Sequence, residues 1–120
     1  MNIHAPRPIP GVPSWKEILG ISVANVDLPG AVRLLCDLVS ERRFTKIGFL
    51  NAHNANIAYS DAEFAHALQD FLIFSDGIGV DMAAKFLYGE AFPDNLNGTD
   101  FIPAFLVASK QPLIIGLLGA

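Results

Sequence analysis

The chain has 120 residues, of which 52% are hydrophobic and 17% are charged, and its formal net charge is −4 at pH 7. This length suffices for one domain with a real core but not for two. The apolar content excludes a disordered chain, and the lack of a basic face argues against a nucleic-acid partner. The single cysteine, Cys36, cannot form an intramolecular disulfide, so we expect a reducing compartment rather than a disulfide-stapled secreted fold.

The start of the chain differs in composition from the rest. The first 14 residues hold four prolines and lack the apolar core of a signal peptide. We expect residues 1–14 to form a flexible, extended tail and residues 15–120 to form the folded portion. No run of residues approaches the roughly 20 apolar residues that a membrane span needs.

The predicted elements begin with a strand, or a tight pair of strands bent at Gly20, over residues 17–23. Asp27 is placed to cap a helix that runs to about Arg43, with a proline in its first turn. A buried strand is predicted over residues 46–50. Residues 51–59 are predicted to form a turn followed by a helix, and Asp61 is predicted to cap a second helix.

The second half of the chain continues the alternation. Residues 71–74 predict a buried strand, and residues 78–88 predict a helix that ends at Gly89. A polar loop over residues 93–98 follows, and Thr99 or Asp100 caps another helix, with Pro103 still in its first turn. The apolar run at residues 113–118 predicts a last buried strand.

Apolar strands that alternate with helices predict an α/β fold. We expect a Rossmann-like parallel sheet with helices on both faces, in which residues 46–50, 71–74 and 113–118 are neighbouring parallel strands. The chain stops just after the last predicted strand, where such a fold needs a further helix. We therefore expect a truncated chain and a sheet that is incomplete at the C-terminus.

Ligands of open parallel sheets bind beyond the carboxyl ends of the strands. This rule selects residues 51–54, 75–79 and 116–120, together with the loop that includes Asn97, Gly98, Thr99 and Asp100. Asp76 follows four apolar residues, so its carboxylate lies at the edge of a dry core and could act as a general base. The alternative is that Asp76 only caps the next helix or makes an Asp-Gly turn.

The remaining candidates also have two interpretations. Gly77 and Gly79 let the backbone approach a phosphate at a helix N-terminus, or they serve an ordinary turn. Asn51 and Asn54 could bind a sugar or diphosphate, or cap a helix. His53 could contact a phosphate or move a proton, or be structural. No His, Cys and Asp set has the spacing of a metal site, and no cofactor is expected.

Six motifs in order resemble the WecB/TagA/CpsF family of glycosyltransferases. They are ILGISVANV, LNAHNAN, the Asp-Ala-Glu-Phe helix start, SDGIGVDMAAKFLYG, LNGTDFIPAFL and LIIGLLGA, and they cover roughly residues 16–120. The resemblance implies a Rossmann-like enzyme that moves a sugar from a UDP-sugar, of the N-acetylmannosamine or uronic acid type, to a polyprenyl-diphosphate-linked acceptor. It assigns the general base to Asp76 and maps a strand-closing asparagine to Asn51.

The resemblance also implies a place in bacterial surface-polysaccharide synthesis. It suggests a cytoplasmic protein held peripherally at the inner face of the plasma membrane through a missing C-terminal part, and it leaves a homo-oligomer open. Two positions depart from the family pattern, because Phe49 replaces a common threonine and Asn95 a common arginine. Two alternatives stay open: an inactive truncated remnant, and a generic Rossmann-like nucleotide-binding module.

Overall fold

The computed structural model describes residues 9, 11–110 and 112–116. In these residues the chain forms two strands, a helix, a strand, two helices, a strand and two helices, in that order. The expected mixed α/β class is confirmed. The sheet is smaller than predicted, because the described residues form one parallel pair and one hairpin rather than a full Rossmann-like sheet.

The first two strands form a hairpin. β1 (Trp15–Ile18) pairs antiparallel with β2 (Ile21–Ala24). The two residues that join them, Leu19 and Gly20, have φ values of 48° and 86°. Positive φ at both positions gives a tight turn whose twist matches that of the flanking strands. Of the two predicted arrangements, the pair of strands is therefore the correct one.

α1 (Leu28–Ser40) begins where the sequence predicts it. The side chain of Asp27 accepts a hydrogen bond from the Gly30 amide at 2.8 Å and thereby caps the helix. The helix ends at Ser40, before the predicted end at Arg43. Arg42 lies in the left-handed region, with φ 54°, and a residue in that conformation cannot continue a right-handed helix.

The parallel sheet consists of β3 (Lys46–Leu50) and β4 (Phe71–Ser75), which pair in register from their first residues to their last. α2 (Ala52–Ser60) and α3 (Ala62–Leu68) form the crossover between them, which parallel strands need because no short turn can join them. The prediction that the two apolar runs are neighbouring parallel strands is confirmed.

α4 (Ile78–Tyr88) ends at Gly89, which has φ 80°, as predicted. Val80 and Ala84 bury one of its faces. The opposite face carries large apolar side chains that are exposed in the described part of the chain, namely Ile78, Met82 and Phe86.

α5 (Gly98–Ala108) begins earlier than predicted. Its N-cap is Asn97, whose side chain accepts from the Asp100 amide at 3.0 Å, so the predicted caps at Thr99 or Asp100 are wrong. Pro103 consequently lies inside the helix and not in its first turn. Its missing N–H removes one bond from the helical ladder there.

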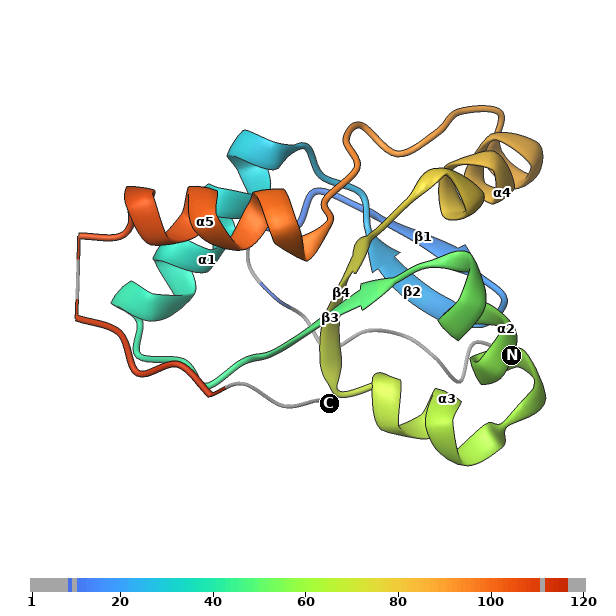
Figure 1. Cartoon of the computed structure of the whole chain (residues 1–120), viewed down its shortest axis with the longest axis horizontal. Helices are drawn as coiled ribbons and strands as arrows, with labels where there is room; N and C mark the ends of the chain where they lie inside the picture. The colour runs from blue at the N-terminus through green and yellow to red at the C-terminus, as the bar shows by residue number, and fades with distance from the viewer. Residues whose placement is uncertain (1–8, 10, 111, 117–120) are drawn as a thin grey trace.

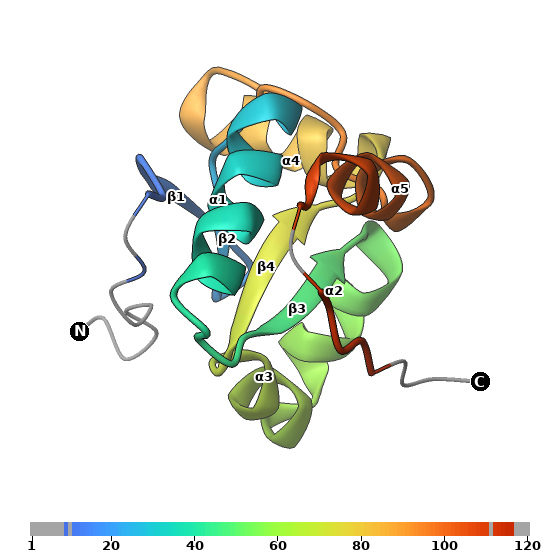
Figure 2. The same ribbon diagram turned by 90° about the vertical axis from the view of Figure 1, so that its left-hand side faces the viewer.

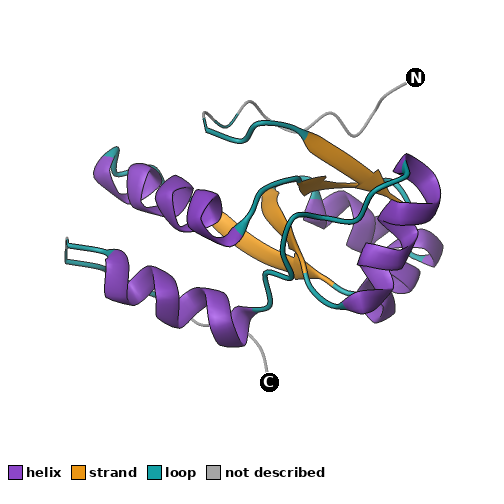
Figure 3. Ribbon diagram, turned by 90° about the horizontal axis from the view of Figure 1, so that it is seen from above, coloured by secondary structure: helices purple, strands orange, loops and turns teal. Residues whose placement is uncertain are grey.

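Successive residues of β4 point into two separate cores, as the alternation of a strand requires. Leu72 and Phe74 pack with α1 and α5, whereas Ile73 packs with α2, α3 and α4. Figures 1 and 3 show α1 and α5 on one side of the strands and the other three helices on the opposite side. The prediction of helices on both faces is therefore confirmed.

The hairpin lies beside the parallel pair. Figure 2 shows β2 next to β4, on the side away from β3, and the two strands contact each other. β2 does not join the hydrogen-bonded ladder of β4 within the described residues. The chain before the hairpin also reaches the core, because Ile9 and Val12 pack against the core cluster that α1, α5 and β4 share. The rest of the predicted tail, residues 1–8 and 10, lies outside the described residues.

The predicted strand over residues 113–118 is wrong for the residues that the structure describes. Residues 112–116 form neither strand nor helix, and Ile114 and Ile115 are 105% and 53% exposed. Leu113 alone among these residues packs against the core. A short apolar run becomes a strand only if a partner strand accepts it, which apolar content alone does not decide. Residues 117–120 lie outside the described part of the chain.

Candidate active site

The carboxyl edge of the parallel pair brings the first two candidates together. Leu50 and Ser75 are opposite each other at the ends of β3 and β4, so Asn51 and Asp76 are the next residues at the same edge. The Asp76 amide donates to the Leu50 carbonyl at 2.9 Å, which extends the pairing by one residue. The backbones of Asn51 and Asp76 are therefore held side by side.

Asn51 and Asn54 form a reciprocal cap at the start of α2. The Asn51 side chain accepts from the Asn54 amide at 2.9 Å, and the Asn54 side chain accepts from the Asn51 amide at 2.8 Å. The Asn54 Nδ2 also donates to the Phe49 carbonyl at 2.9 Å. Both polar atoms of the Asn54 side chain thus have a partner within the chain, whereas the Asn51 Nδ2 has none among the described residues. His53, between them, is exposed.

Gly77 begins α4 in a conformation that only glycine adopts without strain. Its φ is 103° and its ψ 168°, and it provides no side-chain cap for the helix. Apart from its chain neighbours, no described atom would lie within 4 Å of a Cβ atom at this position. The Gly77 amide donates to the Asn95 Oδ1 at 3.0 Å, so the turn after Asp76 is tied to a residue far along the chain.

Gly79 allows the first turns of two helices to meet. A Cβ atom built on Gly79 would lie 2.7 Å from the Cβ atom of Ala52, the first residue of α2. No real pair of Cβ atoms comes so close, so this position needs glycine for packing. The N-termini of α2 and α4 therefore lie against each other at the carboxyl edge.

The polar loop after α4 runs across the end of β4. The Leu96 amide donates to the Ser75 carbonyl at 2.9 Å, and the Ser75 hydroxyl donates to the Asp94 carbonyl at 3.1 Å. The Asp94 Oδ2 also accepts from the Leu28 amide at 2.6 Å, at the start of α1. The loop is thus fixed to both β4 and α1.

The start of α5 closes the same edge. Asn97 and Asp100 bond each other twice, because Asn97 Nδ2 donates to Asp100 Oδ2 at 3.1 Å and Asn97 Oδ1 accepts from the Asp100 amide at 3.0 Å. A Cβ atom on Gly98 would lie 3.5 Å from the ring of Phe49 in β3. Thr99 is exposed. The structure therefore gathers the N-termini of α2, α4 and α5 around the ends of β3 and β4.

Asp76 does not cap α4, because the residue at the cap position is Gly77. The side chain of Asp76 is half-buried. No described residue donates a hydrogen bond to its carboxylate. A carboxylate that lies at the carboxyl edge of parallel strands and has no internal partners is able to accept a proton from a hydroxyl group.

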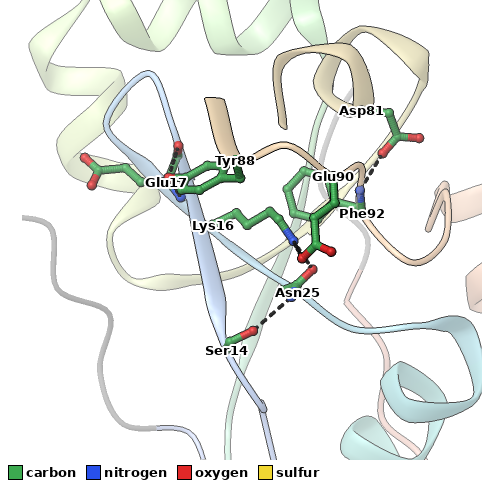
Figure 4. Close-up of polar contacts among 8 residues, drawn as sticks. All are labelled: Ser14, Lys16, Glu17, Asn25, Asp81, Tyr88, Glu90 and Phe92. Carbon is green, nitrogen blue, oxygen red and sulfur yellow. Dashed lines mark hydrogen bonds and ion pairs between the residues drawn. The ribbon is translucent and has the colours of Figure 1, made fainter. Parts of the chain in front are cut away.

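The sequence analysis did not predict a buried lysine that lies beside the segment after α4 (Figure 4). The side chain of Lys16 is 6% exposed, and its Nζ donates to the Asn25 Oδ1 at 2.7 Å and lies 3.4 Å from the Glu90 Oε1. It also lies 5.4 Å from the ring centroid of Phe92. The alternation of strand side chains, which puts Lys16 on the same face as Ile18, was the available signal.

Among the described residues, no group of three His, Cys, Asp or Glu side chains could hold a metal ion, and no helix is long and apolar enough to cross a bilayer. A cavity of about 460 Å³ lies at the start of α1, where Asn25, Asp27 and Arg33 contribute to its wall. Its lining does not include Asp76, Asn51 or Asn97, so it is separate from the candidate site.

A comparison with protein families supports the resemblance found in the motifs. The model of the glycosyl transferase WecG/TagA/CpsF family matches residues 16–120. The match includes every candidate residue at the carboxyl edge. Compared with individual curated proteins, the chain has no match.

Proposed function

Since the chain belongs to the WecG/TagA/CpsF family of glycosyltransferases, we propose that it transfers a sugar from a UDP-sugar to a polyprenyl-diphosphate-linked saccharide. The proposed donor sugar is of the N-acetylmannosamine or uronic acid type, and the product serves bacterial surface-polysaccharide synthesis. The observation that carries the proposal is the position of Asp76. Its carboxylate is half-buried at the carboxyl edge of the parallel strands and has no partner among the described residues.

In the proposed reaction Asp76 is the general base. A hydroxyl of the acceptor attacks the anomeric carbon of the donor while its proton passes to the Asp76 carboxylate. The bond between the anomeric carbon and the diphosphate oxygen breaks, and UDP leaves with the bonding electrons. Attack from the face opposite the leaving group inverts the configuration at that carbon.

The neighbouring groups suit the diphosphate of the donor. The N-terminus of α4 has no side-chain cap, and the free N–H groups of a helix N-terminus favour phosphate. Gly77 leaves open space beside this turn. The unpartnered Nδ2 of Asn51 adds a hydrogen-bond donor at the same edge. We assign diphosphate contacts to these groups, and acceptor or sugar contacts to His53, Thr99 and Asp100.

The substrates define the proposed location. A polyprenyl-linked acceptor stays in the bilayer and a UDP-sugar is cytoplasmic, so the protein would work peripherally at the inner face of the plasma membrane. The donor and the acceptor are the proposed partners.

The test is a transfer assay with a radiolabelled UDP-sugar and a polyprenyl-diphosphate-linked acceptor, comparing the wild-type chain with Asp76→Asn. The amide keeps the shape of the side chain but cannot take up the proton, so we expect turnover to fall by about 10²–10⁴-fold. UDP-sugar binding and the melting temperature should be nearly unchanged. Asp61→Asn, which keeps a helix cap away from the site, is the matched control.

The assay also separates the alternatives. Undiminished turnover in a folded Asp76→Asn protein contradicts the base assignment. A wild-type chain that binds UDP-sugar without transferring it favours an inactive remnant. Binding of other nucleotides with equal affinity favours a generic nucleotide-binding module.

A further inference from the structure

Asn95 is held in place by its neighbours on both sides. The residue before it, Asp94, bonds Ser75 through its carbonyl and the Leu28 amide through its carboxylate. The residue after it, Leu96, is 1% exposed and donates to the Ser75 carbonyl at 2.9 Å. The backbone of Asn95 is therefore fixed at the end of β4, although its own side chain is exposed. When this side chain makes a bond, the conformational freedom that is lost is therefore that of its own rotamers and not that of the backbone.

That side chain makes its bond to the turn that carries Asp76. The Asn95 Oδ1 accepts from the Gly77 amide at 3.0 Å. Gly77 has no side chain, its φ is 103°, and apart from its chain neighbours no described atom lies within 4 Å of its missing Cβ position. Side-chain packing therefore cannot hold Gly77. The bond from Asn95 spans 18 residues of sequence and ties the turn to the anchored loop.

We propose that Asn95 is a positioning residue for Asp76: its Oδ1 holds the Gly77 amide and thereby fixes the direction in which Asp76 presents its carboxylate. This inference rests on the proposed function, in which Asp76 is the base. The Asn95 side chain shapes the turn from within, which a side chain without an acceptor oxygen could not do.

Removal of the Asn95 side chain should lower turnover more than it lowers the stability of the fold. Asn95 is exposed, so its removal buries no unsatisfied group, and the loop keeps its other anchors at Asp94 and Leu96. A displacement of about 1 Å of a reacting group can lower a rate by about 10²-fold. A loosened turn at Gly77 would produce displacements of this size in Asp76 while the core stays folded.

The experiment compares Asn95→Ala, which removes the acceptor, with Asn95→Asp, which keeps it. Asn56→Ala, an exposed asparagine on the outer part of α2, is the matched control. Hydrogen exchange of the Gly77 amide is measured by NMR in each chain, together with kcat, the KM for UDP-sugar and the melting temperature. For Asn95→Ala we expect exchange about tenfold faster, kcat lower by about 10- to 100-fold, and little change in melting temperature.

Asn95→Asp should return both the exchange rate and kcat to near the wild-type values. Its added negative charge should raise the KM for the diphosphate-containing donor. An unchanged Gly77 exchange rate in Asn95→Ala overturns the proposal, and so does faster exchange with undiminished kcat. Failure of Asn95→Asp to restore kcat while it restores exchange also overturns it. If the wild-type chain shows no transfer at all, the positioning role falls with the proposed function, whereas the exchange data still decide whether Asn95 holds the turn.

Discussion

The phenol of Tyr88 bonds both main-chain groups of Glu17, accepting from its amide at 2.8 Å and donating to its carbonyl at 2.8 Å (Figure 4). Tyr88 is the last residue of α4, and Glu17 lies in the middle of β1. An outer strand presents N–H and C=O groups that need partners. One phenol satisfies two of them and attaches the end of α4 to the hairpin.

Tyr88→Phe should therefore lower the free energy of unfolding by about 1–2 kcal/mol, since each of the two bonds contributes about 0.5–1.5 kcal/mol. The measurement is urea denaturation. Tyr59→Phe is the control, because Tyr59 is 75% exposed on α2 and makes no hydrogen bond with a described residue. Equal effects of the two substitutions would show that the contact with Glu17 contributes nothing.

The two hydrogen-bond partners of the buried Lys16 ammonium should contribute differently to the free energy of unfolding. Asn25 is partly buried and bonds the ammonium at 2.7 Å, whereas the side chain of Glu90 is 74% exposed and lies 3.4 Å away. Asn25→Ala should cost about 1.5–3 kcal/mol, because it removes a bond to a charged, buried group. Glu90→Gln should change stability by less than about 1 kcal/mol, as exposed ion pairs do.

A double-mutant cycle tests whether the stability loss in Asn25→Ala comes from leaving the Lys16 ammonium without its hydrogen-bond partner. Lys16→Met removes the ammonium but keeps an apolar stem against Phe92, so in this background Asn25→Ala should cost much less. Urea denaturation of the wild type, the two single variants and the double variant gives the coupling free energy between Lys16 and Asn25. Additive effects would contradict a direct Lys16–Asn25 interaction.

The contact between Gly79 and Ala52 predicts a second-site rescue. Gly79→Ala should destabilise the chain by about 1–3 kcal/mol, because its Cβ would meet that of Ala52 at 2.7 Å. Ala52→Gly should restore most of this loss by removing the opposing methyl group. Thermal melts of both single variants and the double variant measure the rescue. The same Ala52→Gly change should not rescue Gly77→Ala, whose strain comes from φ 103° and not from a clash.

Substitutions of Asn54 and Asn51 should have different effects, the first on stability and the second on UDP binding. Asn54→Ala removes the side-chain bonds to the Asn51 amide and the Phe49 carbonyl, so it should lower stability by about 1–2 kcal/mol. Asn51→Asp keeps the N-cap but replaces the free Nδ2 donor by a negative oxygen. It should leave the melting temperature nearly unchanged and weaken UDP binding by about tenfold, roughly the value of one charge-assisted hydrogen bond. Calorimetric titration with UDP measures this, and unchanged affinity would remove Asn51 from the site.

Local chemistry in the sequence determined most of the elements. Asp27 and Asp61 cap helices where predicted, and Gly89 ends α4 in the left-handed conformation. These outcomes follow from interactions between residues at most four positions apart, so they can be predicted from the local sequence. The parallel pairing of β3 and β4 was also predictable, because two buried runs joined by helices allow few other arrangements.

Tertiary structure alone decided the features that depend on distant partners. The run at residues 113–116 has the composition of a strand, yet it finds no strand to pair with in the described residues. Lys16 is buried because Asn25, Glu90 and Phe92 surround its charge. The bond between Asn95 and Gly77 joins two motifs that the sequence shows only as separate segments. Each of these results depends on which surfaces meet after the chain has folded, and the order of residues near a position does not identify these distant partners.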